Sequence, residues 1–386
     1  MTDSPAERYL RLGLRLARHD DGVVDAYFGP AELAAQVGAE APVEPRALVK
    51  EADALLGELA DGWLRDQVAA LRVFAGGLAG ESRSYADEVE GCYGIRPVHT
   101  DEAVFAEAHE RLADLLPGDG PLTQRFLRWR ESMFVPADKV EPVVAAVIEE
   151  ARTQTRALVD LPEGEGVDLE FVRDVTWLGY NDYLGDLRGR VSFNVTKPMT
   201  AMDLLLVAIH ETYPGHQAER SCHEFFLVRG QGLLEETLAL TPAPQSVISE
   251  GIGELAPQIL LTGEGGPRLA AILHDAGVEF DLAHALAVER AARPCQWAQV
   301  NAALLLHEHG AGQADARSYL ERWALIGPDM AAHVVRFITE PSSRTYVMNY
   351  PAGYRLCQSY VDGDPHRFRR LLTEQMRVTD LTTSSR

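Results

Sequence analysis

The segment Thr200–Gln217, with the sequence TAMDLLLVAIHETYPGHQ, constrains the fold of this chain more than any other part of it. Thr200 and Asp203 form a Thr-x-x-Asp pattern, which is typical of the capped first turn of a helix. The apolar run Leu204–Ile209 follows and is long enough for about two turns of buried helix. The sequence therefore predicts a capped, buried helix that ends close to its polar residues.

The polar residues at the end of this helix are His210 and Glu211, and His216 follows six residues after the first histidine. Zinc peptidases present one metal ligand and one general base in this way, usually with a second histidine at i+4. An i,i+6 pair lies about 240° apart on a regular helix, so the two histidines cannot share a face. Pro214 and Gly215 between them favour a helix break, which would bring His216 back to the same metal ion.

A third ligand is expected downstream, in the stretch SVISEGIGELA. Glu250 and Glu254 lie at i,i+4 on one face of a largely apolar helix. Two carboxylates on one face repel each other unless a cation or a hydrogen-bond donor lies between them. Glu250 would complete a three-ligand zinc site with an open fourth position, and Glu254 would orient a ligand histidine.

Four motifs together resemble the bacterial family called domain of unknown function 885. They are HETYPGH at 210–216, SEG at 249–251, YPAG at 350–353 and the approach segment YNDYLGDLRGRVSFNVTKP at 180–198. The resemblance implies a large, mainly α zincin-like fold, similar to the M32 thermostable carboxypeptidases, with a small β element before the active-site helix. It also implies peptidase activity, with exopeptidase or carboxypeptidase action as one subclass.

Three further residues are candidates for contact with substrate. Tyr350 matches the tyrosine of the family's Y-x-x-G motif and could donate a hydrogen bond to a developing oxyanion. Arg344 could hold a substrate carboxylate. Asn194 lies in a predicted strand, Val191–Val195, and edge strands before the active-site helix of zincins can pair with extended substrates.

The net charge of −22 over 386 residues argues against nucleic acid and anionic membrane surfaces as partners. The N-terminal stretch lacks a long apolar core and no segment reads as a membrane span, so a cytoplasmic location is expected. The four cysteines are far apart and form no CxxC pair, which excludes a thiolate metal site; they are Cys92, Cys222, Cys295 and Cys357. The sequence does not indicate an oligomeric state.

Helical patterns joined by short Pro/Gly loops predict an all-α part over residues 1–160. Residues 161–386 would form the catalytic part with the metal site, packed against the first as one compact unit. The leading hypothesis is a hydrolase of short peptides with one Zn²⁺ per chain, held by His210, His216 and Glu250, and with Glu211 as general base. Two alternatives are a metal-dependent amidase or esterase with a non-peptide substrate, and a non-catalytic helical ligand-binding protein.

Overall fold

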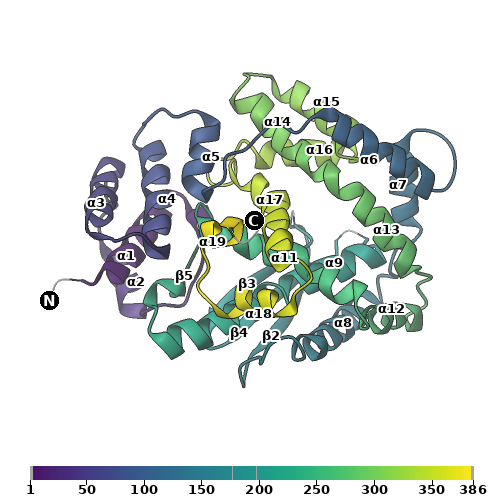
Figure 1. The fold of residues 1–386 in the computed structure, drawn as a ribbon, viewed down its shortest axis with the longest axis horizontal. Coiled ribbons are helices and arrows are strands. Elements are labelled where there is room, and N and C mark those ends of the chain that lie inside the picture. Colours follow the sequence, from purple (N-terminus) through teal and green to yellow (C-terminus); the bar gives the residue numbers. More distant parts are fainter. Residues whose placement is uncertain (1–2, 176, 197, 384–386) are drawn as a thin grey trace.

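A computed structural model describes residues 3–175, 177–196 and 198–383, and most of them lie in helices (Figure 1). The N-terminal helices are joined by short turns, as predicted, because each buries an apolar face against its neighbours. The eight helices are α1 (Pro5–Ala17), α2 (Ala31–Ala39), α3 (Pro45–Glu58), α4 (Trp63–Leu78), α5 (Tyr85–Tyr93), α6 (Glu102–Leu115), α7 (Leu122–Glu131) and α8 (Val140–Thr155).

The rest of the chain is also largely helical. Its helices are α9 (Ala201–Glu211), α10 (His216–Cys222), α11 (Pro244–Thr262), α12 (Gly266–Asp275), α13 (Leu282–Ala292), α14 (Trp297–His307), α15 (Gln313–Trp323), α16 (Pro328–Phe337), α17 (Asn349–Val361), α18 (Pro365–Thr373) and α19 (Val378–Thr383). Short 3-10 turns occur at Asp21–Val23, Leu234–Thr237, Arg293–Gln296 and Tyr346–Met348, and α10 continues into a π-helical turn, His223–Arg229.

A small sheet precedes α9, as expected for the fold class. β4 (Arg188–Asn194) pairs in parallel with β2 (Gly166–Val172) and antiparallel with β3 (Gly179–Gly185), so β4 is the central strand. The expectation that the strand before α9 lies at an edge is therefore wrong: β4 is covered on both sides, and Val191 and Phe193 are fully buried. A second pair, β1 (Val24–Tyr27) and β5 (Leu238–Leu240), is antiparallel, so the prediction that residues 1–160 are all-α is wrong at this one strand.

The predicted helix break is confirmed. Thr200 caps α9, since its Oγ1 accepts a hydrogen bond from the Asp203 amide at 3.1 Å. α9 ends at Glu211, α10 begins at His216, and a cis Tyr213–Pro214 peptide lies between them. A Cβ at Gly215 would overlap the His210 carbonyl oxygen, so the return of the chain toward the first histidine requires glycine here.

α11 and α17 cross near the centre of the molecule (Figure 1). A Cβ on Gly251 would overlap the Gly353 carbonyl, and a Cβ on Gly353 would overlap the Val247 carbonyl. The two backbones are therefore in direct contact, which brings the first turn of α17 beside Glu250. Gly353 of the Tyr-Pro-Ala-Gly stretch serves this contact.

The largest hydrophobic cores take residues from both sides of residue 160. One packs α6, α7 and α8 against α9, and another packs α5 against α11 and α17. A further core joins α1, α3 and α4 to β5. The division into residues 1–160 and 161–386 stays a prediction. Among the helices of the described residues, none combines the length and the apolar character needed to cross a membrane.

Candidate metal centre and its cavities

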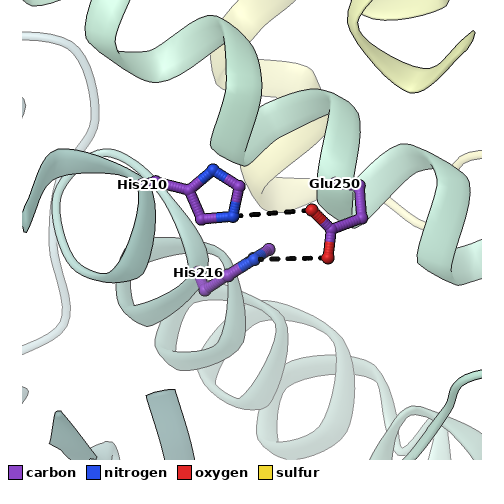
Figure 2. Close-up of side chains that lie close together, drawn as sticks. All are labelled: His210, His216 and Glu250. Carbon is purple, nitrogen blue, oxygen red and sulfur yellow. Dashed lines mark ion pairs between the residues drawn. The ribbon is translucent and has the colours of Figure 1, made fainter. Parts of the chain in front are cut away.

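Three side chains from three helices converge at the break between α9 and α10: His210, His216 and Glu250 (Figure 2). One ligand atom from each lies within 4.8 Å of the other two. His210 Nε2 is 3.5 Å from Glu250 Oε2, and His216 Nε2 is 3.9 Å from Glu250 Oε1. The two imidazoles meet nearly at a right angle, with ring centres 4.6 Å apart. Two imidazole nitrogens and one carboxylate form a donor set that could hold a metal ion.

The second nitrogen of each histidine faces another carboxylate. His216 Nδ1 lies 3.2 Å from Ser249 Oγ and 3.5 Å from Glu219 Oε2, and the Ser249 hydroxyl donates to that same Glu219 oxygen at 2.6 Å. His210 Nδ1 lies 4.0 Å from Glu254 Oε1. Both rings therefore present Nε2 to the centre of the group, which is how carboxylates orient ligand histidines in metal sites.

The hydrogen bonding of Glu250 indicates whether this group of residues can accommodate a cation. Its Oε2 is buried and accepts no hydrogen bond from the described part of the chain, a costly arrangement unless a positive charge lies nearby. Burial by itself would lower the pKa of His210, but the carboxylates of Glu250, Glu211 and Glu254 outweigh it and raise that pKa to about 10. The group therefore demands positive charge at its centre, and a divalent metal ion fits it.

Glu211 follows the candidate ligand His210 directly in the sequence and lines the same cavity as His210 and His216. Asn181 of β3 donates its amide to the Glu211 carbonyl at 2.7 Å, which fixes the end of α9 against the sheet. Burial raises the pKa of Glu211, while His210 and His216 oppose the shift. A carboxylate with a raised pKa next to a metal site is suited to accept a proton near neutral pH.

Two tyrosines line the cavity beside this group: Tyr346 from the 3-10 turn Tyr346–Met348 and Tyr350 from α17. Tyr346 donates its hydroxyl to Glu250 Oε1 at 2.5 Å, and the rings of Tyr346 and Tyr350 are 5.7 Å apart. Burial, followed by the negative charge of Glu250, raises the pKa of both hydroxyls well above their usual range. Both therefore remain protonated hydrogen-bond donors.

Asn194 and Arg344 are not found among the described residues that line the metal cavity. Asn194 is fully buried, and its amide donates to the Val175 and Trp177 carbonyls at 2.9 and 3.0 Å, which holds the loop before β3. Arg344 points elsewhere and forms a two-point ion pair with Glu88 of α5. The structure therefore does not bring either residue to the substrate position that the sequence suggested.

The candidate ligands His210, His216 and Glu250, called the metal-ligating group here, border two cavities. The first, of about 380 Å³, is bounded by β3 and includes Arg220 and Tyr350. The second, of about 410 Å³, also reaches His210 and Glu211 and continues toward α13. It shares Arg293 and other residues with a third cavity of about 630 Å³, whose walls are largely apolar. These are volumes that small-molecule and peptide ligands occupy.

Some residues of this centre were missed by sequence reasoning. Glu219 follows His216 by three residues, a spacing that places the two side chains on one helix face, so this partner was accessible from the sequence. Ser249 precedes Glu250 directly. Asn181, Arg220 and Arg293 reach the cavities only through the tertiary fold, and no local pattern marks them.

No protein-family model matches the chain, and none of the curated proteins does either. Membership of the domain of unknown function 885 family therefore stays a prediction. Among solved structures, a provisionally named lipoprotein of Colwellia psychrerythraea matches 88% of this chain at 13% identity and a TM-score of 0.57. A lipoprotein of unknown function from Shewanella oneidensis, also provisionally named, matches 92% of it at 13% identity and a TM-score of 0.52, over 69% of its own length.

The chain spans 62% of the length of the Colwellia protein. These two likenesses show a shared fold. A carboxypeptidase of Pyrococcus furiosus also matches, over 97% of this chain and 90% of its own, at 12% identity and a TM-score of 0.41, a value too low to establish a common fold.

Proposed function

We propose that this chain is a zinc-dependent hydrolase that cleaves peptide bonds in short peptides. The observation that carries the proposal is the convergence of His210, His216 and Glu250 on one point, with Glu211 beside them in the same cavity. Two histidines and a glutamate with an adjacent carboxylate base are the working parts of a zinc peptidase.

Each residue has a role that follows from its position. Zinc held by the three ligands would supply Lewis acidity, which makes water more acidic and polarises a carbonyl. Glu211 takes a proton from the attacking water and passes it to the leaving amine. Tyr350 donates a hydrogen bond to the carbonyl oxygen as negative charge develops there. Tyr346 holds Glu250 in place through its 2.5 Å hydrogen bond.

Short substrates fit this site better than folded proteins. The candidate base lies at the junction of two cavities of about 380 and 410 Å³, which can hold a few residues but no globular surface. β3 is the edge strand that borders the first cavity, so an extended peptide could pair with its backbone.

The test combines metal analysis with activity. Purified wild type should contain about one zinc per chain, and His210→Ala or His216→Ala should lose most of it. Glu211→Gln should keep the zinc and lose roughly 10²–10⁴-fold in turnover of a short-peptide library. Glu279→Gln, at an exposed position outside the described cavities, is the matched control.

Two results would overturn the proposal: absence of zinc after reconstitution, or wild-type peptide turnover by Glu211→Gln. Library peptides blocked at either end would also report whether a free terminus is required.

A further inference from the structure

The second cavity, together with the third cavity that it joins, is called the acidic arm here. The two cavities share several lining residues, among them Asp203, Glu289, Arg293 and Gln296. The acidic arm is lined at one end by His210 and Glu211, and farther along by residues of α13 and of the 3-10 turn Arg293–Gln296. It is therefore the path that a substrate would follow on one side of the metal-ligating group.

The charges along the acidic arm do not balance. In its part of about 410 Å³, the described lining residues include four carboxylates, one guanidinium, that of Arg293, and two histidines, His210 and His333; the carboxylates are Asp203, Glu211, Glu254 and Glu289. Arg293 is bound to Glu254 at 3.0 Å and stacks on Tyr354, 3.8 Å above its ring centre.

Arg130, which lines the adjoining part of about 630 Å³, forms its close ion pair with Asp203. Each guanidinium of the acidic arm is thus already committed to another carboxylate.

Among the described residues, the negative charge of Glu289 is paired only with an arginine that it shares with Asp203. Its one ion pair within the described chain is with Arg130, which lies 3.6 Å from Oε1 and is shared with Asp203. Oε1 itself is buried and accepts no hydrogen bond from the described residues, while 21% of the side chain is exposed and Glu289 lines the cavity. An under-compensated carboxylate of this kind is costly unless a ligand supplies a donor.

A second acceptor lies in the same place. Gln296 Oε1 is also buried without a hydrogen-bond partner among the described residues, and Gln296 lines the same two cavities as Glu289. Burial raises the pKa of Glu289, and the charges of Arg130 and Arg293 oppose this shift without cancelling it. Apolar residues such as Leu178 and Met330 line both cavities.

We propose that the acidic arm is a subsite for a cationic amine of the substrate, with Glu289 as the anion that binds it and Gln296 as a second acceptor. This inference rests on the proposed function, because it places the amine on a peptide whose scissile bond lies at Glu211. The amine is either the free α-amino group of a short peptide or the ε-amino group of a lysine side chain. Both are ammonium groups with three hydrogen-bond donors, and the acidic arm contains more carboxylate acceptors than guanidinium donors.

The experiment measures binding without turnover, so that its failure is distinguishable from failure of the proposed function. Zinc-loaded Glu211→Gln protein is titrated by calorimetry with two pairs of probes. The first pair is tetra-alanine and its N-acetyl form. The second is N-acetyl-Ala-Lys-Ala-amide and the same peptide with norleucine in place of lysine. The first pair tests the α-amino source and the second pair the side-chain source.

At least one cationic probe should bind roughly tenfold or more tightly than its neutral partner, the worth of one charge-assisted hydrogen bond. Adding Glu289→Gln should reduce that preference to about twofold or less, while adding the control Glu279→Gln should leave it intact. Gln296→Leu should also weaken the preference, and it serves as a second variant if Glu289→Gln is poorly folded by circular dichroism.

Three outcomes would overturn the inference: equal affinity for both members of each pair, a cation preference that survives Glu289→Gln, or no measurable binding of any probe at millimolar concentration. Hydrolysis of peptides by the wild type alongside any of these outcomes would leave the proposed function standing and remove only the subsite.

Discussion

Gly253 of α11 lies directly against the imidazole of His210: a Cβ on residue 253 would approach His210 Cε1 to 2.7 Å and Nδ1 to 2.8 Å. One turn earlier on the same helix, Glu250 supplies its carboxylate to the metal-ligating group. The glycine therefore sets how closely α11 approaches α9, and with it the distance between the histidine and the carboxylate.

Gly253→Ala should consequently disturb the centre. Because the added methyl group must push the imidazole or the helix aside, we expect a loss of roughly 1–3 kcal/mol in free energy of unfolding and weaker zinc binding. Chemical denaturation and competition with a zinc chelator measure the two effects. Gly38→Ala is the control, because a Cβ there meets nothing within 4 Å and should stabilise α2 by about 0.5–1 kcal/mol. Unchanged zinc affinity in Gly253→Ala would contradict the expectation.

Glu219 and Ser249 should tune zinc affinity through His216. Glu219→Gln and Ser249→Ala each remove a partner of His216 Nδ1. Loss of such a partner should weaken zinc binding about 10–100-fold while leaving the three ligands in place. Chelator competition gives the affinity, and exposed Glu264→Gln is the matched control. If both variants bind zinc like the wild type, the orientation of His216 does not depend on this pair.

Tyr346 and Tyr350 should differ in what their hydroxyls do. Tyr350→Phe should lower kcat by roughly 10²–10³-fold with zinc content unchanged, because it removes an oxyanion donor. Tyr346→Phe removes the hydrogen bond to Glu250 and should weaken zinc binding first. Steady-state kinetics alongside zinc analysis separates the two patterns. A Tyr350→Phe protein with wild-type kcat would leave Tyr346 as the candidate donor.

His223 should make stability depend on pH. Its Nδ1 lies 3.2 Å from Glu236 Oε2 and its Nε2 lies 3.3 Å from the Leu371 carbonyl, so both nitrogens face acceptors and the doubly protonated ring satisfies both. Burial opposes that charge, but Glu236 and Glu219 outweigh it and raise the pKa of His223.

A raised pKa in the folded state means that the stabilisation is fully present below about pH 6.5, the unfolded value, and is lost as pH rises through the folded value. His223→Gln should therefore cost roughly 1.5–3 kcal/mol of unfolding free energy at pH 6 and less at higher pH. Urea denaturation of both proteins between pH 6 and pH 9 measures the difference. A constant difference across that range would show that His223 does not change its charge.

Local chemistry determined a large part of this protein. The cap at Thr200, the break at Pro214 and Gly215 and the helical character of both halves depend on residues close in sequence, so the pattern alone predicts them. His210, Glu211 and His216 belong to that same stretch. Glu250 was within reach because a carboxylate on an apolar helix needs a partner, whatever the fold.

Tertiary packing decided the rest. No local sequence pattern distinguishes the roles of Arg344 and Arg293. In the folded chain Arg344 pairs with Glu88, whereas Arg293 pairs with Glu254 and lines the acidic arm, because tertiary packing sets which carboxylate each arginine meets. β4 became the central strand when β2 and β3 paired with its two edges. Glu289 of α13 meets Arg130 of α7 only in the folded chain, and there it shares this arginine with Asp203 of α9. Such features arise between residues far apart in the chain, and no local pattern encodes them.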